Sequence, residues 1–210
     1  MRCGLFISLE GIDGAGKTEM RDFMADHLTK RGIPVIRTRE PGGTPLAEEM
    51  RELLLKKREA DYEPFDIVAE TAMFFAARRQ HLTQMIKPKM AQGYVVLSDR
   101  FSDSAYSYQY AKGISHEAIR AIEVATIGNY KPNHTFYLDI DVETSLARHT
   151  ARGRPLDRME EEFYATAEKA IEGYQQRIWG DQDRFIVIDA KPPQEEVVAE
   201  VLKQLDKLIG

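Results

Sequence analysis

The sequence predicts an α/β fold in which helices cover both faces of a five-stranded parallel sheet, giving three layers. Two observations predict it. Five short runs of apolar residues lack the polar alternation of half-exposed strands, and longer stretches with near-helical apolar spacing separate them. A third observation, a glycine-rich turn after the first run, indicates where a ligand binds. Strands that alternate with helices in this way form parallel sheets with right-handed crossovers.

The expected strands are short and nearly continuous in apolar side chains. They cover residues 5–9, 35–38, 94–98, 135–140 and 185–188. The first expected helix, residues 18–31, carries apolar side chains at Met20, Phe23, Met24 and Leu28, and Gly32 and Pro34 end it. By the same reasoning, further helices are expected at residues 45–57, 65–92, 116–129, 143–152, 160–179 and 193–209.

The glycine-rich turn reads Gly-Ile-Asp-Gly-Ala-Gly-Lys-Thr at residues 11–18 and matches the phosphate-binding pattern G-x-x-x-x-G-K-[ST] in full. Glycines let backbone N–H groups turn inward around phosphates, and the positive end of the next helix points at the same place. Lys17 is expected to reach the β- and γ-phosphates, and the Thr18 hydroxyl to bind Mg²⁺. The fold is therefore expected to be that of the P-loop NTPases.

The composition is that of one globular domain, expected to span residues 1–210, with 43% hydrophobic and 30% charged residues. A net charge of −5 gives no basic field for nucleic acid. The single cysteine, Cys3, excludes disulfide frameworks and multi-cysteine metal sites within the chain. No apolar run approaches the roughly 20 residues that span a membrane, and no signal-peptide pattern is present. We expect a cytoplasmic protein without nucleic-acid or membrane partners.

Two strand ends place an arginine beside a carboxylate, at Arg39-Glu40 and at Asp99-Arg100. Ligands of open parallel sheets bind outside the carboxyl ends of the strands. A structural ion pair explains either end singly. Both together, at the edge where the triphosphate lies, indicate a second ligand that carries a phosphate and thus phosphoryl transfer.

Residues 148–158 contain four arginines, with Gly153 and Pro155 interrupting the helical pattern. One reading is a solvated helix end whose charges pair with the acidic residues that follow. The other is a lid, at about residues 148–160, that brings arginines onto phosphates and keeps water out. Beside a phosphate loop, the lid is favoured.

Several segments together resemble the thymidylate kinase family over nearly the whole chain. They are Glu-Gly-Ile-Asp-Gly-Ala-Gly-Lys-Thr at 10–18, Thr-Arg-Glu-Pro-Gly-Gly-Thr at 38–44, Phe-Phe-Ala-Ala-Arg at 74–78, Asp-Arg-Phe at 99–101, Tyr-Leu-Asp at 137–139 and Leu-Asp-Arg at 156–158. The resemblance implies transfer of the γ-phosphate of ATP to dTMP with Mg²⁺, giving dTDP, by an enzyme that is usually a homodimer.

The resemblance also implies roles for individual residues. Phe74 stacks on thymine, Arg78 binds a thymine carbonyl, and Tyr108 packs under the deoxyribose. The full dTMP-binding set is Arg39, Glu40, Pro41, Phe74, Arg78, Asp99, Arg100, Ser104, Tyr108 and Gln109. The ATP-binding set is Gly11, Ile12, Asp13, Gly14, Ala15, Gly16, Lys17, Thr18, Arg148 and Arg154. The implied metal ligands are Thr18, Asp13 and Asp99, and the implied catalytic residues are Lys17, Arg100, Arg152 and Asp13.

One family style places a catalytic arginine in the phosphate loop and the other places it in the lid. Gly14 in the loop and the lid arginines make this chain similar to the second, bacterial style, with Arg152 as the main transition-state contact. Ala105 departs from relatives that have a polar residue there, so a kinase of dUMP or of a 5-modified dUMP, including a phage enzyme, is an alternative. A nucleotide-dependent switch protein is a further alternative, which the lack of an Asn-Lys-x-Asp motif disfavours.

Overall fold

The computed structural model describes residues 4–57, 59, 62–153 and 158–210, and of Arg152 only the backbone. Its strands form one parallel sheet in the order β2-β3-β1-β4-β5, which confirms the predicted sheet. The strands are β1 (Leu5–Glu10), β2 (Val35–Arg39), β3 (Val95–Asp99), β4 (His134–Asp139) and β5 (Phe185–Asp189).

Helices connect the strands and follow the last one. They are α1 (Lys17–Lys30), α2 (Pro45–Leu55), α3 (Ile67–His81), the π-helix η1 (Leu82–Ile86), α4 (Lys87–Ala91), α5 (Asp103–Ala111), α6 (His116–Ile127), α7 (Val142–Arg152), α8 (Arg158–Tyr164), α9 (Ala167–Gly180) and α10 (Gln194–Ile209). Side chains cap four of them at the positions where polar N-caps are expected, namely Thr44, Asp66, Ser115 and Asp141.

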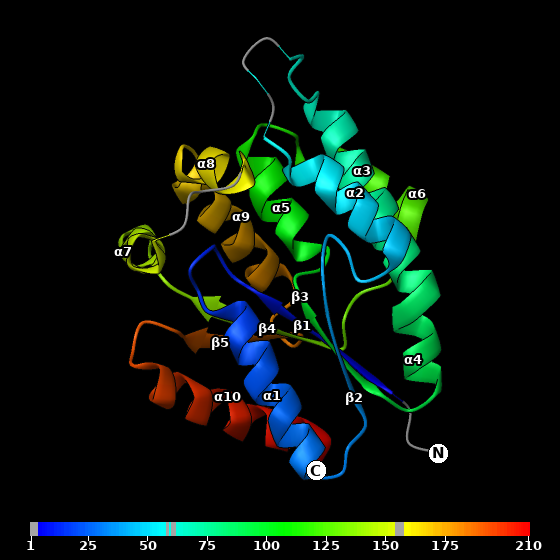
Figure 1. Cartoon of the computed structure of the whole chain (residues 1–210), viewed down its shortest axis with the longest axis vertical. Helices are drawn as coiled ribbons and strands as arrows, with labels where there is room; N and C mark the ends of the chain where they lie inside the picture. Colours follow the sequence, from blue (N-terminus) through cyan, green and yellow to red (C-terminus); the bar gives the residue numbers. More distant parts are fainter. Residues whose placement is uncertain (1–3, 58, 60–61, 154–157) are drawn as a thin grey trace.

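The predicted three-layer arrangement is present. Figure 1 shows α1 and α10 on one side of the sheet and α3, α5, α6 and α9 on the other. Alternate residues of β1 point to opposite layers. Ile7 and Leu9 belong to the core that includes α1 and α10, whereas Phe6 packs with Phe75 and Phe101 in the second core. All five of these side chains are fully buried.

Three helical predictions need correction. The single helix expected at 65–92 is α3, a π-helical turn and α4 in succession, because Pro88 has no N–H to continue the α-helical ladder. The helix expected at 160–179 divides into α8 and α9. Helix α5 was not among the expected helices; eight of its nine residues are buried, so it shows no one-sided apolar pattern.

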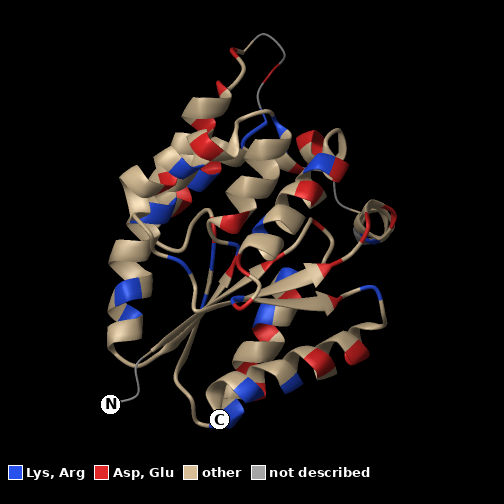
Figure 2. Ribbon diagram, turned by 180° about the vertical axis from the view of Figure 1, so that it is seen from behind, with Lys and Arg blue, Asp and Glu red and all other residues tan. Residues whose placement is uncertain are grey.

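The lid expected at about 148–160 begins in the last turn of α7 and ends in the first turn of α8. Residues 154–157 lie outside the described part of the chain, and with them Arg154. In Figure 2, basic and acidic positions are interspersed over the helices, and both signs meet where the strands end. No described helix is long and apolar enough to cross a membrane.

Candidate functional site

The phosphate loop lies where the sequence predicts, between β1 and α1. Gly16 precedes α1 in the left-handed conformation, with φ of 89°. The Lys17 side chain is 7% exposed and curls back over the loop, donating to the Ile12 carbonyl oxygen at 2.9 Å. Burial and the nearby Arg100 lower the pKa of Lys17 to about 8. A triphosphate in the loop would raise this pKa again, because its negative charge favours the protonated amino group.

Gly14 shows why the loop carries no arginine. Its φ is +81°, and an added Cβ would lie 3.0 Å from the Ser145 carbonyl oxygen and 3.1 Å from its Cα. Helix α7 therefore packs directly on the loop, and Ser145 Oγ donates to the Asp13 carbonyl oxygen at 2.6 Å. A side chain at position 14 would push α7 away, so this arrangement leaves the extra cation to another segment.

Thr18 and Asp99 meet between the loop and the end of β3. The Thr18 hydroxyl donates to Asp99 Oδ2 at 2.5 Å. A hydroxyl and a carboxylate are oxygen ligands of the kind that Mg²⁺ takes, together with water and substrate phosphates. Within the described residues there is no cluster of three or more His, Cys, Asp or Glu side chains for a metal. The donor set thus fits an ion that takes most of its ligands from nucleotide and water.

Arg100 lies at the centre of the site. It is the one non-glycine residue with positive φ, 73°, in the described part of the chain, a conformation that turns its side chain back over β1. Its guanidinium donates to the Gly11 carbonyl oxygen at 3.2 Å, Ser104 Oγ at 3.1 Å, the Tyr174 hydroxyl at 3.2 Å, Asp13 Oδ1 at 2.6 Å and the Tyr108 hydroxyl at 2.8 Å.

Asp13 joins the loop to Arg100. Its carboxylate also accepts from the Tyr108 hydroxyl at 2.9 Å, and Lys17 Nζ lies 3.9 Å away. Burial alone would raise the pKa of Asp13, but the charges of Arg100 and Lys17 lower it below its usual value. Asp13 is therefore a carboxylate flanked by two cations, on the side of the loop that faces Tyr108.

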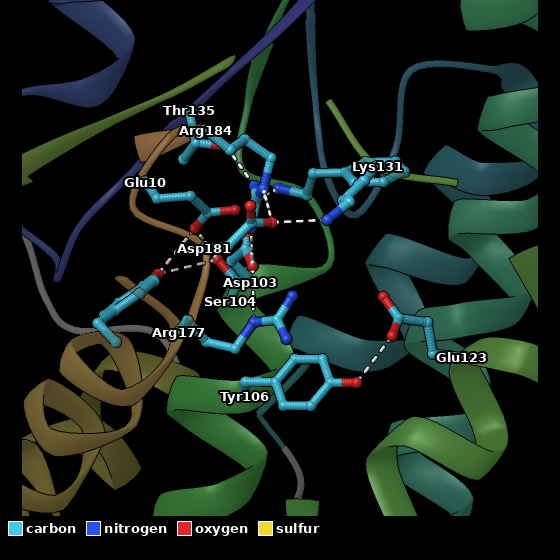
Figure 3. A network of polar contacts seen from close by, with 12 residues as sticks. Glu10, Asp103, Ser104, Tyr106, Glu123, Lys131, Thr135, Arg177, Asp181 and Arg184 are labelled. Carbon is cyan, nitrogen blue, oxygen red and sulfur yellow. Dashed lines mark hydrogen bonds and ion pairs between the residues drawn. The ribbon is translucent and has the colours of Figure 1, made fainter. Parts of the chain in front are cut away.

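A second layer of polar groups holds the partners of Arg100, and Figure 3 shows its members Glu10, Asp103 and Ser104. The buried Glu10 accepts from the Phe101 N–H at 2.7 Å, from Ser104 Oγ at 2.6 Å and from the Tyr174 hydroxyl at 2.8 Å. Burial and the neighbouring Asp103 carboxylate raise the pKa of Glu10 to about 7. Glu10 thus holds two of the groups that in turn hold Arg100.

The fully buried Asp103 continues this layer and ties α5 to α9 and β5 (Figure 3). Its carboxylate accepts from Arg177 Nε at 2.9 Å and from Arg184 at 2.7 and 2.9 Å. These two cations lower the pKa of Asp103 in spite of its burial. The network fixes the start of α5, the helix that supplies Ser104 and Tyr108.

One cavity of about 300 Å³ runs from the phosphate loop to the residues expected to bind the base. At its far end are Phe74, Arg78, Ala105 and Gln109. Arg78 is 3% exposed, and its Nη1 atom has no hydrogen-bond partner among the described residues. A buried donor without a partner is costly, so this atom is suited to an acceptor on a ligand.

Most predicted site residues line this single cavity. They are Asp13, Gly14, Gly16, Lys17, Thr18, Arg39, Glu40, Pro41, Phe74, Arg78, Asp99, Arg100, Ser104, Tyr108 and Gln109. Gly11, Ile12 and Ala15 are buried inside the loop. Arg148 donates to the carbonyl oxygens of Gly14 at 3.2 Å and Ala190 at 2.7 Å. The side chain of Arg152, like Arg154, lies outside the described residues, so their roles stay predictions.

Sequence reasoning missed several residues that line the cavity, among them Arg21, Arg51, Met159 and Glu160. Arg51 donates to the Pro41 carbonyl oxygen at 2.9 Å and adds a cation beside Arg39. The sequence held a signal for this residue. Arg51 lies about one and a half turns into the helix that follows the Pro-Gly-Gly-Thr segment, close to the predicted phosphate site. Glu160 and Met159 carried none, because the fold of α8 over the cavity decides their position.

Comparisons with known proteins agree with this geometry. The model of the family described as thymidylate kinase matches residues 9–201. The chain is 47% identical to a thymidylate kinase of Hahella chejuensis, with all of both chains covered. It is 46% identical to one of Teredinibacter turnerae, covering 98% of this chain and 99% of that one.

Among solved structures, the thymidylate kinase of Ehrlichia chaffeensis is similar, with a TM-score of 0.73 and 32% identity. The match covers 96% of this chain and 98% of that one. The matched residues include the phosphate loop, Arg78, Arg100 and the helices around the cavity. This chain belongs to the thymidylate kinase family.

Proposed function

We propose that this chain transfers the γ-phosphate of ATP to dTMP, giving ADP and dTDP, as a single nucleoside monophosphate kinase domain. The observation that carries the proposal is the single cavity that joins a phosphate loop to a pocket with a buried, unpartnered arginine donor. A protein that only hydrolysed a nucleotide would have no use for the second half. The family of the chain supports the same activity.

In this reaction an oxygen of the dTMP phosphate attacks the γ-phosphorus of ATP while the bond from that phosphorus to the β,γ-bridging oxygen breaks. Such a step needs alignment and cations rather than covalent help. Lys17 supplies charge from the loop side, and Arg100 supplies it from the β3 side. Arg39 and Arg51 line the cavity where the acceptor phosphate enters. Asp13 and Tyr108 orient the Arg100 fork.

Thr18 and Asp99 are the residues that would hold Mg²⁺. The ion would neutralise phosphate charge during transfer. Asp13, the third expected ligand, accepts from Arg100 and Tyr108, and its role toward the metal stays a prediction. Met159 and Glu160 of α8 cover the cavity from the side of the lid, where exclusion of water protects ATP from hydrolysis.

The base pocket favours a pyrimidine with a ring carbonyl. Phe74, 8% exposed, offers an aromatic face, and Arg78 offers only donors. dUMP presents the same carbonyls as dTMP, so selection between them depends on space for the methyl group near Ala105. The similarity to thymidylate kinases favours dTMP over dUMP, over 5-modified derivatives of dUMP and over the role of a nucleotide-dependent switch.

A coupled assay of ADP release with dTMP, dUMP, dCMP, dGMP and dAMP tests the proposal. We expect the highest kcat/KM with dTMP. Lys17→Ala and Arg100→Lys should each lower kcat by at least about 100-fold, because each removes a fixed donor from the developing charge. Lys203→Ala, which alters an exposed surface pair with Glu200, is the matched control and should keep full activity. Equal turnover of all five acceptors would refute the assignment.

We also infer that two copies pair through α2, α3 and α6, which lie side by side (Figure 1). Val68 of α3 and Val124 of α6 are 52% and 49% exposed, and Leu46 of α2 is 45% exposed. Sedimentation equilibrium should give a dimer, and Val124→Glu should weaken it; a monomer at all concentrations would contradict the pairing. The cytoplasmic location stays a prediction.

A further inference from the structure

A chain of four buried polar side chains runs behind the cavity, and two of them, Glu40 and Arg78, line it. Glu40 Oε2 accepts from Arg78 Nε at 2.6 Å, and Glu40 Oε1 contacts His81 Nδ1 at 2.9 Å. His81 Nε2 in turn contacts the Thr38 hydroxyl at 2.7 Å. The chain thus runs from β2, through the loop that follows it, to one face of α3.

All four side chains are shielded from water. His81 is fully buried, and Arg78, Glu40 and Thr38 are 3%, 4% and 6% exposed. A buried carboxylate needs partners for both oxygens. Arg78 satisfies one oxygen of Glu40 and His81 satisfies the other, so each oxygen has a partner within the protein. Glu40 was predicted to bind dTMP itself, but its contacts suit a different task.

The directions of the hydrogen bonds follow from the chemistry of the groups. A carboxylate only accepts, so His81 Nδ1 carries a proton and donates to Glu40. The Thr38 hydroxyl can then donate to Nε2 of a neutral imidazole. One carboxylate faces one guanidinium charge, which balances the buried pair.

The remaining contacts of Arg78 leave one nitrogen for a ligand. Nη2 donates to the Phe101 carbonyl oxygen at 3.0 Å, and the guanidinium carbon lies 4.6 Å from the centre of the Phe75 ring. Nε is taken by Glu40. Nη1 is buried without a partner, and Arg78 lines the cavity. An arginine side chain loses rotamer freedom when it is fixed. Here the folded protein already fixes the Arg78 side chain, so ligand binding does not have to order it.

We propose that His81 and Glu40 are positioning residues for base recognition, which hold Arg78 so that its Nη1 faces the ring carbonyl of the acceptor base. This inference rests on the proposed function and assigns selectivity within it. His81 is not among the residues that line the cavity, and Glu40, which lines it, acts through its bond to Arg78. Phe74, Arg78 and His81 follow one another at intervals of four and three residues on α3, which places them on one face of the helix.

The consequence is selection between bases by hydrogen-bond polarity. A fixed N–H donor pairs with the carbonyl of thymine or uracil, whereas cytosine presents an amino group at the equivalent ring position and leaves the donor unpaired. Sites built to satisfy a specific hydrogen bond reject analogues that lack it. If His81 loses its contact with Glu40, the guanidinium gains freedom, and this rejection should weaken along with dTMP binding.

The test is steady-state kinetics of His81→Phe, which keeps a buried ring and removes both hydrogen bonds, with dTMP and dCMP as acceptors. We expect KM for dTMP to rise roughly tenfold, and the dTMP-to-dCMP ratio of kcat/KM to fall by a similar factor. KM for ATP should stay within about twofold of wild type. His81→Asn, whose amide nitrogen can take the place of Nδ1 and donate to Glu40, should restore most of both values.

His116→Phe is the matched control. His116 lies on α6, its Nε2 is also buried without a partner, and its ring packs against Tyr110 at 4.3 Å between centroids. The same substitution there should leave KM for dTMP and the base ratio unchanged. If His81→Phe does not fold, Thr38→Val removes the outer hydrogen bond alone and should raise KM for dTMP roughly threefold.

Three results would overturn the inference. One is a wild-type KM for dTMP and a wild-type base ratio in both His81→Phe and Thr38→Val. The second is an equal rise of KM for ATP and dTMP with the base ratio intact, which would indicate a merely structural role. The third is a His81→Asn variant no better than His81→Phe. A wild-type protein inactive with both dTMP and dUMP would instead refute the proposed function, and with it this inference.

Discussion

Replacing Gly173 by alanine should destabilise the protein, although alanine is the better helix former. Gly173 lies within α9 and is buried against α5. An added Cβ would lie 2.2 Å from the Tyr106 carbonyl oxygen and 3.0 Å from the Ser107 Cα. Both atoms belong to the backbone, so no side chain can rotate away. The two helices would have to separate by roughly 1 Å to reach an ordinary contact distance.

The opposing free energies can be compared. Glycine to alanine inside a helix gains about 1 kcal/mol from propensity, whereas overpacking of this kind costs about 1–3 kcal/mol or more. Moving α5 and α9 apart would also remove dispersion contacts along their interface. We expect a net loss of about 2 kcal/mol in the free energy of unfolding. For a chain of this size, that corresponds to a fall of roughly 4–8 °C in Tm.

Gly180→Ala provides the reference, because it makes the same change in the same helix where no atom lies within 4 Å of the added Cβ. It should be neutral or stabilising by up to about 1 kcal/mol. Thermal and urea unfolding of both variants give the comparison. Tyr174 and Ser104, which hold Arg100, lie beside the contact, so Gly173→Ala should also raise KM for dTMP. A Gly173→Ala protein as stable as Gly180→Ala would refute the reasoning.

Two predictions concern protonation. The pKa of Glu10, raised to about 7 from 4.5, means that the native state binds more protons than the unfolded chain in this interval. Stability should therefore fall as pH rises from about 4.5 to 7, by on the order of 3 kcal/mol for this group. Urea unfolding across that pH range should show that the free energy of unfolding falls less steeply in Glu10→Gln than in the wild type. Identical slopes against pH in the two proteins would contradict the raised pKa of Glu10. The pKa of Lys17, lowered to about 8, predicts that ATP binding near pH 9 takes up almost one proton. Calorimetry in buffers of different ionisation enthalpy measures this uptake, which Lys17→Arg should abolish; no uptake in the wild type would rule out the low pKa.

The phosphate loop and the sheet could be read from the sequence because their signals are local. The pattern residues Gly11, Gly16, Lys17 and Thr18 stand in one short segment, and the loop's backbone is expected to do the binding. The residues at the strand ends can be predicted to lie together as well, because a parallel sheet brings the carboxyl ends of its strands to one edge. The sequence therefore predicted that Arg39 and Arg100 would share a cavity with the loop, and they do.

Helix α5 could not be read in the same way. Its buried Ser104, Ser107 and Gln109 interact with polar partners from β1, α9 and α3 instead of forming an apolar stripe. A helix that is buried on all sides has no separate apolar and polar faces, so its sequence lacks the helical spacing of apolar residues.

By itself, the sequence determined the fold class, the phosphate loop and the chemical kinds of side chain at the strand ends. It did so because backbone geometry and sheet topology follow from local patterns. Only the tertiary structure decided how those side chains are used. Arg100 is fixed by five partners, Glu40 is taken up by Arg78 and His81, and one nitrogen of Arg78 is left for a ligand. Such assignments depend on hydrogen bonds between segments far apart in the chain, and no local pattern encodes them.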